Sequence, residues 1–114
     1  MEYRCEIVDN NVQKVSLDGR LVAACSEEFR ADMFNRIAGQ KKVVFDLSKM
    51  SHIDSSGLGV LVSILQWLNA NGGTMKLACL QPRPKIVFDI THVCRVFEIY
   101  DTVEAAVASF NAPA

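Results

Sequence analysis

The sequence predicts an α/β domain in which a mixed β-sheet starts with an N-terminal hairpin and packs against about four α-helices. Three observations predict this fold. The first residues alternate apolar and polar side chains around a turn-forming segment. After them, segments with helical periodicity alternate with short apolar runs. The length of 114 residues is enough to bury one hydrophobic core. We therefore expect one domain over residues 1–114, with right-handed strand-helix-strand crossovers and a loose tail at about residues 111–114.

The hairpin is predicted from two stretches with alternating side chains, residues 4–8 and 12–17. Residues 9–11, Asp-Asn-Asn, separate them and have a composition typical of tight turns. Gly19 is expected to break or bend the second strand before the apolar residues 21–24. The hairpin therefore occupies the start of the chain.

The first helix is expected to begin at Ser26, whose hydroxyl would cap it. Glu27 and Glu28 would follow in the first turn, at the positive end of the helix dipole. Gly39 ends this helix, and residues 43–47 form a nearly continuous apolar run that fits a central strand covered on both faces. The apolar face of the helix is formed by Phe29, Met33 and Ile37.

A second helix is predicted over residues 55–70, because residues 71–73, Asn-Gly-Gly, are a left-handed C-terminal cap signal. The next strand is expected over residues 75–80. Pro84 is well placed in the first turn of a third helix.

The last elements are a short strand over residues 96–100 and a final helix. Asp101 and Glu104 have the spacing of a capping box at its start. One face of this helix is formed by Val103, Ala106, Val107 and Phe110.

Composition places the chain among ordinary soluble domains and argues against several function classes. Twelve Lys and Arg against 13 Asp and Glu give a net charge of -1, which does not attract nucleic acid or an anionic membrane. Residues 57–70 are nearly uncharged but fall short of the roughly 20 apolar residues that cross a bilayer. The first residues lack the pattern of a signal peptide. We expect a cytoplasmic protein that is monomeric when free, with no nucleic-acid partner and no membrane span.

The four cysteines, Cys5, Cys25, Cys79 and Cys94, are far apart in the sequence and have apolar neighbours. Zinc and redox sites usually draw on closely spaced pairs, and the sequence has no C-x-x-C motif. We therefore expect buried free thiols and no metal site.

The most informative segment is residues 52–61, His-Ile-Asp-Ser-Ser-Gly-Leu-Gly-Val-Leu, where a strand leads into a helix. In open α/β sheets this edge is where ligands and chemistry gather. The simplest interpretation is a helix cap formed by Asp54 or Ser55, which is worth about 1 kcal/mol. A cap does not explain Gly57 and Gly59, because each glycine costs up to about 1 kcal/mol within a helix. Such glycines leave the helix start bare, so that another group can approach it.

Two chemical alternatives match the segment less well. A serine hydrolase would use Ser55 or Ser56 as nucleophile and His52 or His92 as base. Its G-x-S-x-G elbow is missing, and His52 lies only three residues before Ser55. Binding of a phosphate or nucleotide would use a G-x-G-x-x-G or P-loop pattern, which the segment lacks, and Asp54 would repel a free anion.

Two segments carry a family resemblance: residues 44–48, Val-Phe-Asp-Leu-Ser, and residues 53–61, Ile-Asp-Ser-Ser-Gly-Leu-Gly-Val-Leu. Together they resemble the signature of the STAS domain, and most closely that of the bacterial anti-sigma factor antagonists. The predicted order of elements matches too, including residues 18–21 before the first helix and residues 99–102 before the last. His52 and the uncharged second helix depart mildly from that pattern and suggest a different partner.

The resemblance implies a regulator of transcription that is a substrate of a kinase and not itself an enzyme. In that family the serine directly after the aspartate is phosphorylated by the anti-sigma factor, a serine kinase of ATPase-type fold, and a serine phosphatase removes the phosphate. Carried over, the acceptor is Ser55, with Ser56 as the alternative. The unphosphorylated form would bind the kinase and free a sigma factor. ATP and metal ions would belong to these partners, so no cofactor is expected on this chain.

Two other functions stay open at this point. One is a non-switching STAS interaction subunit of a lipid-transport or stress-signalling assembly. The other is a small serine hydrolase. Phosphate incorporation separates the switch from both.

The second helix also predicts a partner surface. Its sheet-facing residues are Leu58, Leu61, Leu65 and Leu68, with Val62 beside them. The opposite strip is uncharged and consists of Gly59, Ser63, Gln66 and Ala70, flanked by Val60, Ile64 and Trp67. Surface helices usually carry charge there, so we expect this strip to dock a partner unless another element of the domain covers it. The predicted partner-binding set is Asp46, Asp54, Ser55, Ser56, Gly57, Gly59, Ser63 and Gln66.

Overall fold

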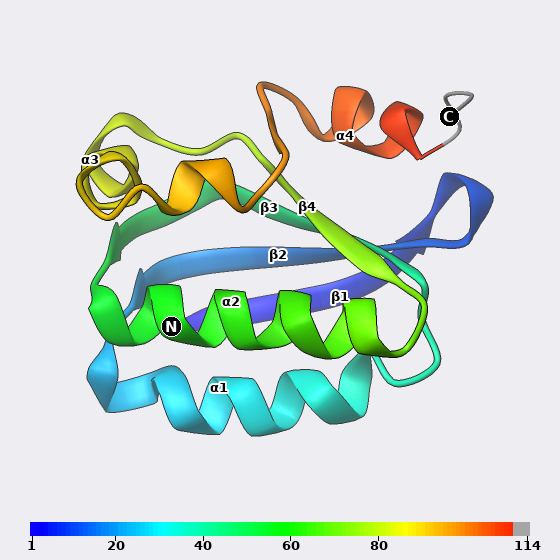
Figure 1. Cartoon of the computed structure of the whole chain (residues 1–114), viewed down its shortest axis with the longest axis horizontal. Helices are drawn as coiled ribbons and strands as arrows, with labels where there is room; N and C mark the ends of the chain where they lie inside the picture. Colours follow the sequence, from blue (N-terminus) through cyan, green and yellow to red (C-terminus); the bar gives the residue numbers. More distant parts are fainter. Residues whose placement is uncertain (111–114) are drawn as a thin grey trace.

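The computed structural model describes residues 1–110 and confirms the predicted mixed α/β fold (Figure 1). The five strands of its sheet lie in the order β1-β2-β3-β4-β5, and only the first pair is antiparallel. The strands are β1 (Glu2–Val8), β2 (Val12–Leu21), β3 (Lys42–Ile53), β4 (Thr74–Ala78) and β5 (Ile99–Tyr100). The helices are α1 (Ala23–Arg36), α2 (Ser55–Ala70), α3 (Pro82–Ile90) and α4 (Val103–Ser109), with short 3-10 turns η1 (Asp9–Asn11) and η2 (Val93–Arg95). The predicted loose tail at 111–114 lies outside the described residues.

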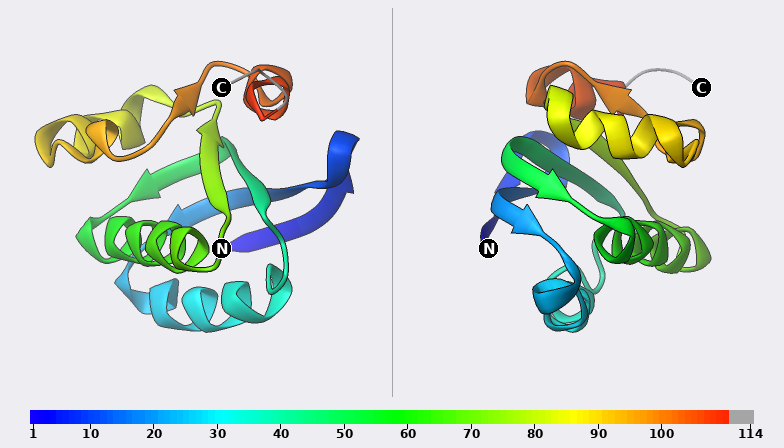
Figure 2. Two further views of the ribbon diagram at one scale, coloured as in Figure 1. Left: turned by 45° about the vertical axis from the view of Figure 1, so that its right-hand side comes forward. Right: turned by 90° about the vertical axis from the view of Figure 1, so that its left-hand side faces the viewer.

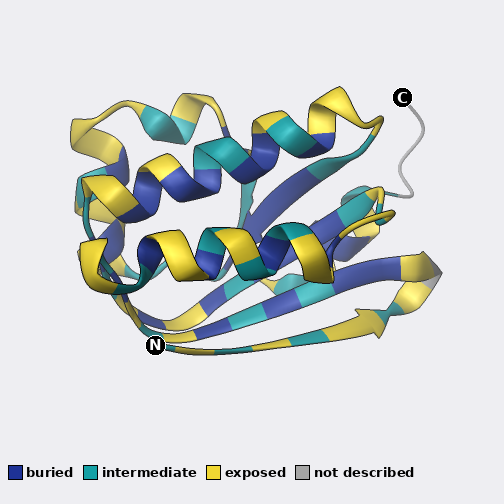
Figure 3. Cartoon of the chain, turned by 90° about the horizontal axis from the view of Figure 1, so that it is seen from below, coloured by how far each residue is buried: buried dark blue, intermediate teal, exposed yellow. Residues whose placement is uncertain are grey.

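The helices cover both faces of the sheet. Helices α1 and α2 lie side by side on one face, and α4 lies on the other (Figures 1 and 2). The buried stripes of α1 and α2 alternate with exposed residues along each helix (Figure 3). The larger core includes the predicted apolar faces of both helices, and its buried members include Phe29, Met33, Ile37, Leu58, Leu61, Leu65 and Leu68. The smaller core under α4 consists of Val12, Val44, Ala78, Ala106 and Val107.

Helix α2 begins and ends where the sequence predicts. It spans Ser55–Ala70, and Gly72 follows with a φ of 82°, a conformation that glycine adopts without strain. Strand β3 is longer than the predicted run, because it continues past its pairing with β4 to Ile53 while still pairing with β2. This extension carries the chain to the edge where α2 starts.

The predicted start of α1 is wrong. The helix begins at Ala23, its N-cap is Val22, which has no side-chain acceptor, and Ser26 lies buried inside the first turns. Glu27 and Glu28 are therefore not in the first turn. The cap comes instead from another part of the chain, as described below.

Of the two outcomes expected at Gly19, a break or a bend, the structure has no break: Gly19, with a φ of 111°, lies at a register shift within β2, which continues to Leu21. Two smaller expectations need correction. Strand β5 begins at Ile99 and not at Val96, because η2 precedes it. The side chain that caps α4 is Thr102, whose Oγ1 accepts from the backbone N–H of Ala105 at 3.0 Å.

The structure also bears on the metal sites and membrane spans that the sequence argued against. Cys5, Cys25, Cys79 and Cys94 are free and only half-buried, not fully buried as predicted. Over residues 1–110, no group of three His, Cys, Asp or Glu side chains is arranged to hold a metal ion. None of the helices in the same range is long and apolar enough to cross a bilayer.

Candidate functional site

The junction between β3 and α2 is held by the Asp54 carboxylate. Its Oδ1 accepts from the backbone N–H of Gly57 at 2.9 Å, which caps α2. Its Oδ2 accepts from the backbone N–H of Ala23 at 3.0 Å, which supplies the cap that α1 lacks locally. One side chain thus joins the starts of both helices on this face of the sheet. The N–H groups of Gly57 and Ala23 favour the ionised carboxylate and hold the pKa of Asp54 below its ordinary value.

The two glycines of this segment have different roles. A Cβ at Gly57 would lie 2.4 Å from the carbonyl oxygen of Leu21 and 2.8 Å from Cγ1 of Ile53. Gly57 is therefore required by close packing of α2 against the strand ends, and it does not bare the helix to a partner. A Cβ at Gly59 would meet nothing within 4 Å, and Gly59 is exposed. The prediction of a bare helix surface applies to Gly59 alone.

Ser55 and Ser56 are exposed at the first two positions of α2. Across the described residues, no hydrogen bond ties either hydroxyl to another side chain. Ser56 lines a groove of about 450 Å³ between α1 and α2, whereas Ser55 directly follows the capping Asp54. The remaining lining residues of this groove are Ala23, Ser26, Glu27, Arg30, Gly59, Val60 and Ser63. Both residues are thus open to solvent at the start of the helix.

The predicted strip on α2 is mostly open. Gly59, Gln66 and Ala70 are exposed, and Ser63 is half-buried beside α1. Val60 and Ile64 were predicted to flank the docking strip. This prediction is wrong, because both side chains are buried in the core.

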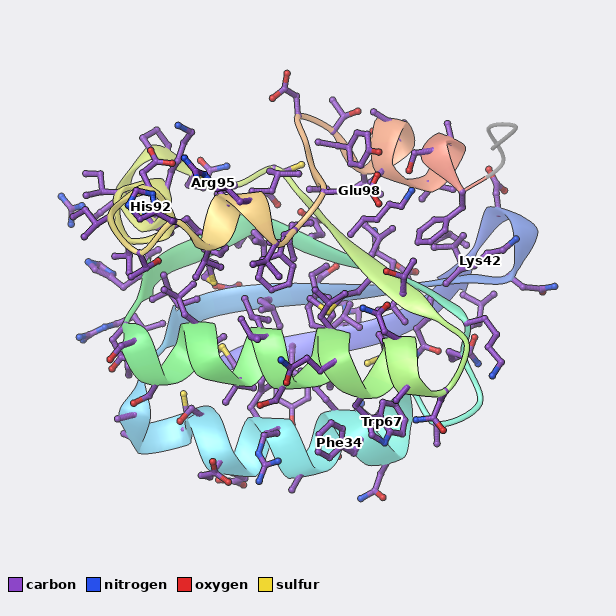
Figure 4. The ribbon with its side chains drawn as sticks, in the orientation of Figure 1. Phe34, Lys42, Trp67, His92, Arg95 and Glu98 are labelled. Carbon is purple, nitrogen blue, oxygen red and sulfur yellow. The ribbon has the colours of Figure 1, made fainter. Side chains whose placement is uncertain are left out.

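Trp67 also packs within the chain. Its ring centroid lies 5.1 Å from that of Phe34 on α1, and the two rings face each other across the two helices (Figure 4). The open surface is thus narrower than predicted and consists of Gly59, Gln66 and Ala70, with Ser63 at its border.

Asp46 lies apart from this junction. Asp46 is in β3, eight residues before Asp54. Its side chain is on the same face of the sheet as that of Val44, which packs toward α4. Helix α2 covers the other face. Its Oδ1 accepts from the backbone N–H of Ser48 at 3.0 Å. The structure therefore does not bring Asp46 together with Ser55.

The histidines do not form a catalytic pair with these serines. His52 Nε2 receives a hydrogen bond from Arg83 Nη1 at 3.2 Å, and His52 Nδ1 lies 3.0 Å from Ser51 Oγ. His92 lies between α3 and η2 (Figure 4). Neither imidazole is hydrogen-bonded to Ser55 or Ser56 in the part of the chain described, so the geometry of a serine hydrolase is not present.

Sequence reasoning missed the contribution of α1. Glu27 and Arg30 face the groove and form an ion pair at 3.2 Å, and Arg30 also lies over the ring of Phe34 at 5.4 Å. The packing of α1 beside α2 places these side chains in the same groove as Ser56, and no local pattern in the sequence predicts that contact.

The fold and the Asp-Ser-Ser-Gly junction define the class of protein. The STAS domain family model matches residues 6–106, and the chain belongs to this family. That match confirms the resemblance stated from the sequence.

The chain is also similar to individual proteins and solved structures. It is 30% identical over 96 residues to BtrV of Bordetella bronchiseptica, a candidate anti-sigma factor antagonist, and the match covers 83% of each chain. The crystal structure of a candidate anti-sigma factor antagonist from Thermotoga maritima aligns with a TM-score of 0.89 at 28% identity, covering 96% of this chain and 95% of that one. The anti-sigma factor antagonist SpoIIAA of Bacillus shares the fold in its unphosphorylated and phosphorylated forms. Those two structures give TM-scores of 0.73 and 0.72 at 21% and 23% identity, covering 98% and 96% of this chain and 100% and 99% of theirs.

Proposed function

We propose that this chain is an anti-sigma factor antagonist that binds an anti-sigma factor with serine-kinase activity and is released when Ser55 is phosphorylated. The observation that carries the proposal is the exposed Ser55 hydroxyl at the first position of α2, next to a carboxylate that fixes the start of the helix. The similarity to anti-sigma factor antagonists supports the partner class. A serine phosphatase would restore the binding form, and ATP and metal ions would belong to the two enzymes.

The position of Ser55 suits a modification that leaves the fold intact. A phosphate there would lie at the positive end of the α2 dipole, which stabilises it by about 0.3 to 2 kcal/mol. The ionised Asp54 carboxylate is its neighbour in the chain and opposes this gain. Both effects are small compared with the free energy of unfolding of a typical domain, which is roughly 5 to 15 kcal/mol. The phosphorylated protein should therefore remain folded.

Phosphorylation of Ser55 should affect partner binding much more strongly than it affects folding. In a protein interface centred on Ser55, an unpaired phosphate dianion costs several kcal/mol. A loss of about 4 kcal/mol weakens a complex nearly a thousandfold. Release on phosphorylation follows directly from this difference.

The surface that the kinase covers extends from Ser55 and Ser56 along the open strip of α2. Gly59 offers no side chain, and Gln66 is exposed and uncharged. Gln66→Glu should lower kinase affinity by about 1 to 3 kcal/mol, because it places an unpaired charge in the interface. Asn35→Asp, on the exposed outer side of α1, adds the same charge elsewhere and serves as the matched control.

The site of modification is tested by incubating the purified protein with ATP and each ATPase-type serine kinase of the source organism. Peptide mass spectrometry should locate one phosphate on Ser55, and the Ser55→Ala protein should take up none. Ser56→Ala is the matched control and should be phosphorylated normally. Normal incorporation into Ser55→Ala would transfer the role of acceptor to Ser56. Absence of any phosphate with every such kinase would favour a non-switching interaction subunit.

A further inference from the structure

Helix α3 presents apolar side chains to solvent. Ile86 is 58% exposed and Ile90 is 72% exposed, whereas Pro84 and Phe88 on the inner side are buried. Residues 83, 86 and 90 have the i, i+3, i+7 spacing of one helix face, so the exposed Arg83 lies on the same face as the two isoleucines. The outer face of α3 thus combines one cation with two large apolar groups.

Arg83 also borders a basic groove at the end of β3. The groove has a volume of about 410 Å³, lies between residues 48–52 and the start of α3, and none of its lining residues is acidic. Because Arg83 Nη1 donates to His52 Nε2, the His52 proton sits on Nδ1 and is donated to Ser51 Oγ, which in turn donates to the carbonyl oxygen of Gly19 at 3.1 Å. The Lys and Arg side chains that line the groove are Lys49 and Arg83.

Arg83 and Lys49 belong to the cations that have no carboxylate partner in the described part of the chain. Arg30, Arg36 and Lys85 each lie within 3.2 Å of a carboxylate on their own helix. Within the described chain, neither Arg83 nor Lys49 forms an ion pair, although Asp18 lies opposite Lys49 in the β2-β3 register. Arg83 donates one N–H to the His52 imidazole, and the remaining N–H groups of its guanidinium can bind another acceptor.

We propose that the face formed by Lys49, His52, Arg83, Ile86 and Ile90 docks an acidic segment of a partner protein that also carries apolar side chains. A carboxylate of that segment would pair with the Arg83 guanidinium, and its apolar residues would cover Ile86 and Ile90. Charge complementarity selects this occupant. Two cations are fewer than the cluster of roughly 4 to 8 that holds a protein on an anionic membrane, and the whole chain carries a net charge of -1. The proposal is independent of Ser55 phosphorylation.

The test uses the full-length ¹⁵N-labelled protein and a short synthetic amphipathic peptide of glutamates and leucines. Amide shifts should be confined to residues 48–52 and 82–90, and the Ser55→Ala protein should bind equally well. Arg83→Glu should weaken binding about fivefold or more, which corresponds to about 1 kcal/mol. A glutamate in the first turn of α3 is compatible with its dipole, and Lys49→Glu is a second variant that leaves α3 unchanged. Lys42→Glu is the matched control, because Lys42 lies at the opposite end of β3 (Figure 4).

Four results with peptides would overturn the proposal, and a fifth result, with vesicles, would do so as well. The four peptide results are no binding of the acidic peptide, equal binding of a peptide with lysines in place of glutamates, shifts that map to the α1-α2 groove, and an affinity unchanged by both Arg83→Glu and Lys49→Glu. Binding to vesicles of phosphatidylglycerol in preference to the acidic peptide would assign the face to a membrane and would equally contradict it. Weaker binding by Ile86→Ser, or by a peptide with serines in place of leucines, would support the apolar half of the surface.

Discussion

Replacement of Asp54 by alanine should destabilise the protein more than loss of an ordinary helix cap. The carboxylate accepts two backbone N–H groups, those of Gly57 and Ala23, and so caps two helices at once. A single cap is worth about 1 kcal/mol, so the double cap should contribute about 2 kcal/mol. For 114 residues, the average unfolding entropy converts this loss into a fall in Tm of about 8 °C.

Urea and thermal unfolding followed by circular dichroism measure this effect. Thr102→Ala removes the single cap of α4 and should cost about 1 kcal/mol. Asp54→Asn keeps one carbonyl oxygen and should fall between Asp54→Ala and the unaltered protein. If Asp54→Ala costs no more than Thr102→Ala, the carboxylate does not hold both helices and our description of the junction is wrong.

The same residue gives a pH dependence with a defined sign. The pKa of Asp54 is lowered in the folded state, chiefly by the Gly57 N–H. Its contribution to stability is therefore present above the unfolded pKa and is lost as the pH falls through the folded pKa. In Asp54→Asn, the loss of stability on acidification should be smaller over this acidic range. An unchanged acid profile would contradict this assignment.

Two further predictions concern packing. Gly57→Ala should destabilise the protein by about 1 to 3 kcal/mol, because its Cβ would meet the Leu21 carbonyl, whereas Gly59→Ala should stabilise α2 by up to about 1 kcal/mol, since nothing lies near its Cβ. Equal effects in urea unfolding would refute the distinction between the two glycines. Lys76 is buried, donates to Ser109 Oγ at 2.7 Å and lies 4.4 Å from the Phe110 ring centroid, so Lys76→Ala should loosen α4. Hydrogen exchange should then accelerate in α4 and stay unchanged in α2, and uniform acceleration would contradict the local role.

The sequence predicted elements where local signals and tertiary packing agree. Helix α2 is an example, because its leucine periodicity and the glycines after it mark the same boundaries that the structure shows. The start of α1 failed because Ser26 offered a plausible local cap, while the real cap comes from Asp54, 31 residues beyond Ala23. No local rule finds a cap that is supplied from a distant strand end.

The sequence predicted some residues of the candidate site correctly and others not. Ser55 and Ser56 are exposed at the helix start as the motif suggests, because the strand-to-helix turn is a local feature. Asp46 was included in the predicted partner-binding set, but strand alternation places it on the face of the sheet that packs toward α4. Gly57 and Gly59 are indistinguishable in the sequence, and only the position of Leu21 separates the packed glycine from the open one.

The central claim is that phosphate on Ser55 controls partner binding, and calorimetric titration of the kinase with both forms of the protein tests it most directly. The unphosphorylated protein should bind, and the Ser55-phosphorylated protein, with its fold verified by circular dichroism, should bind about a hundredfold to a thousandfold more weakly. The Ser55→Ala protein should keep the high affinity of the unphosphorylated form. Equal affinities of the phosphorylated and unphosphorylated proteins would contradict the account.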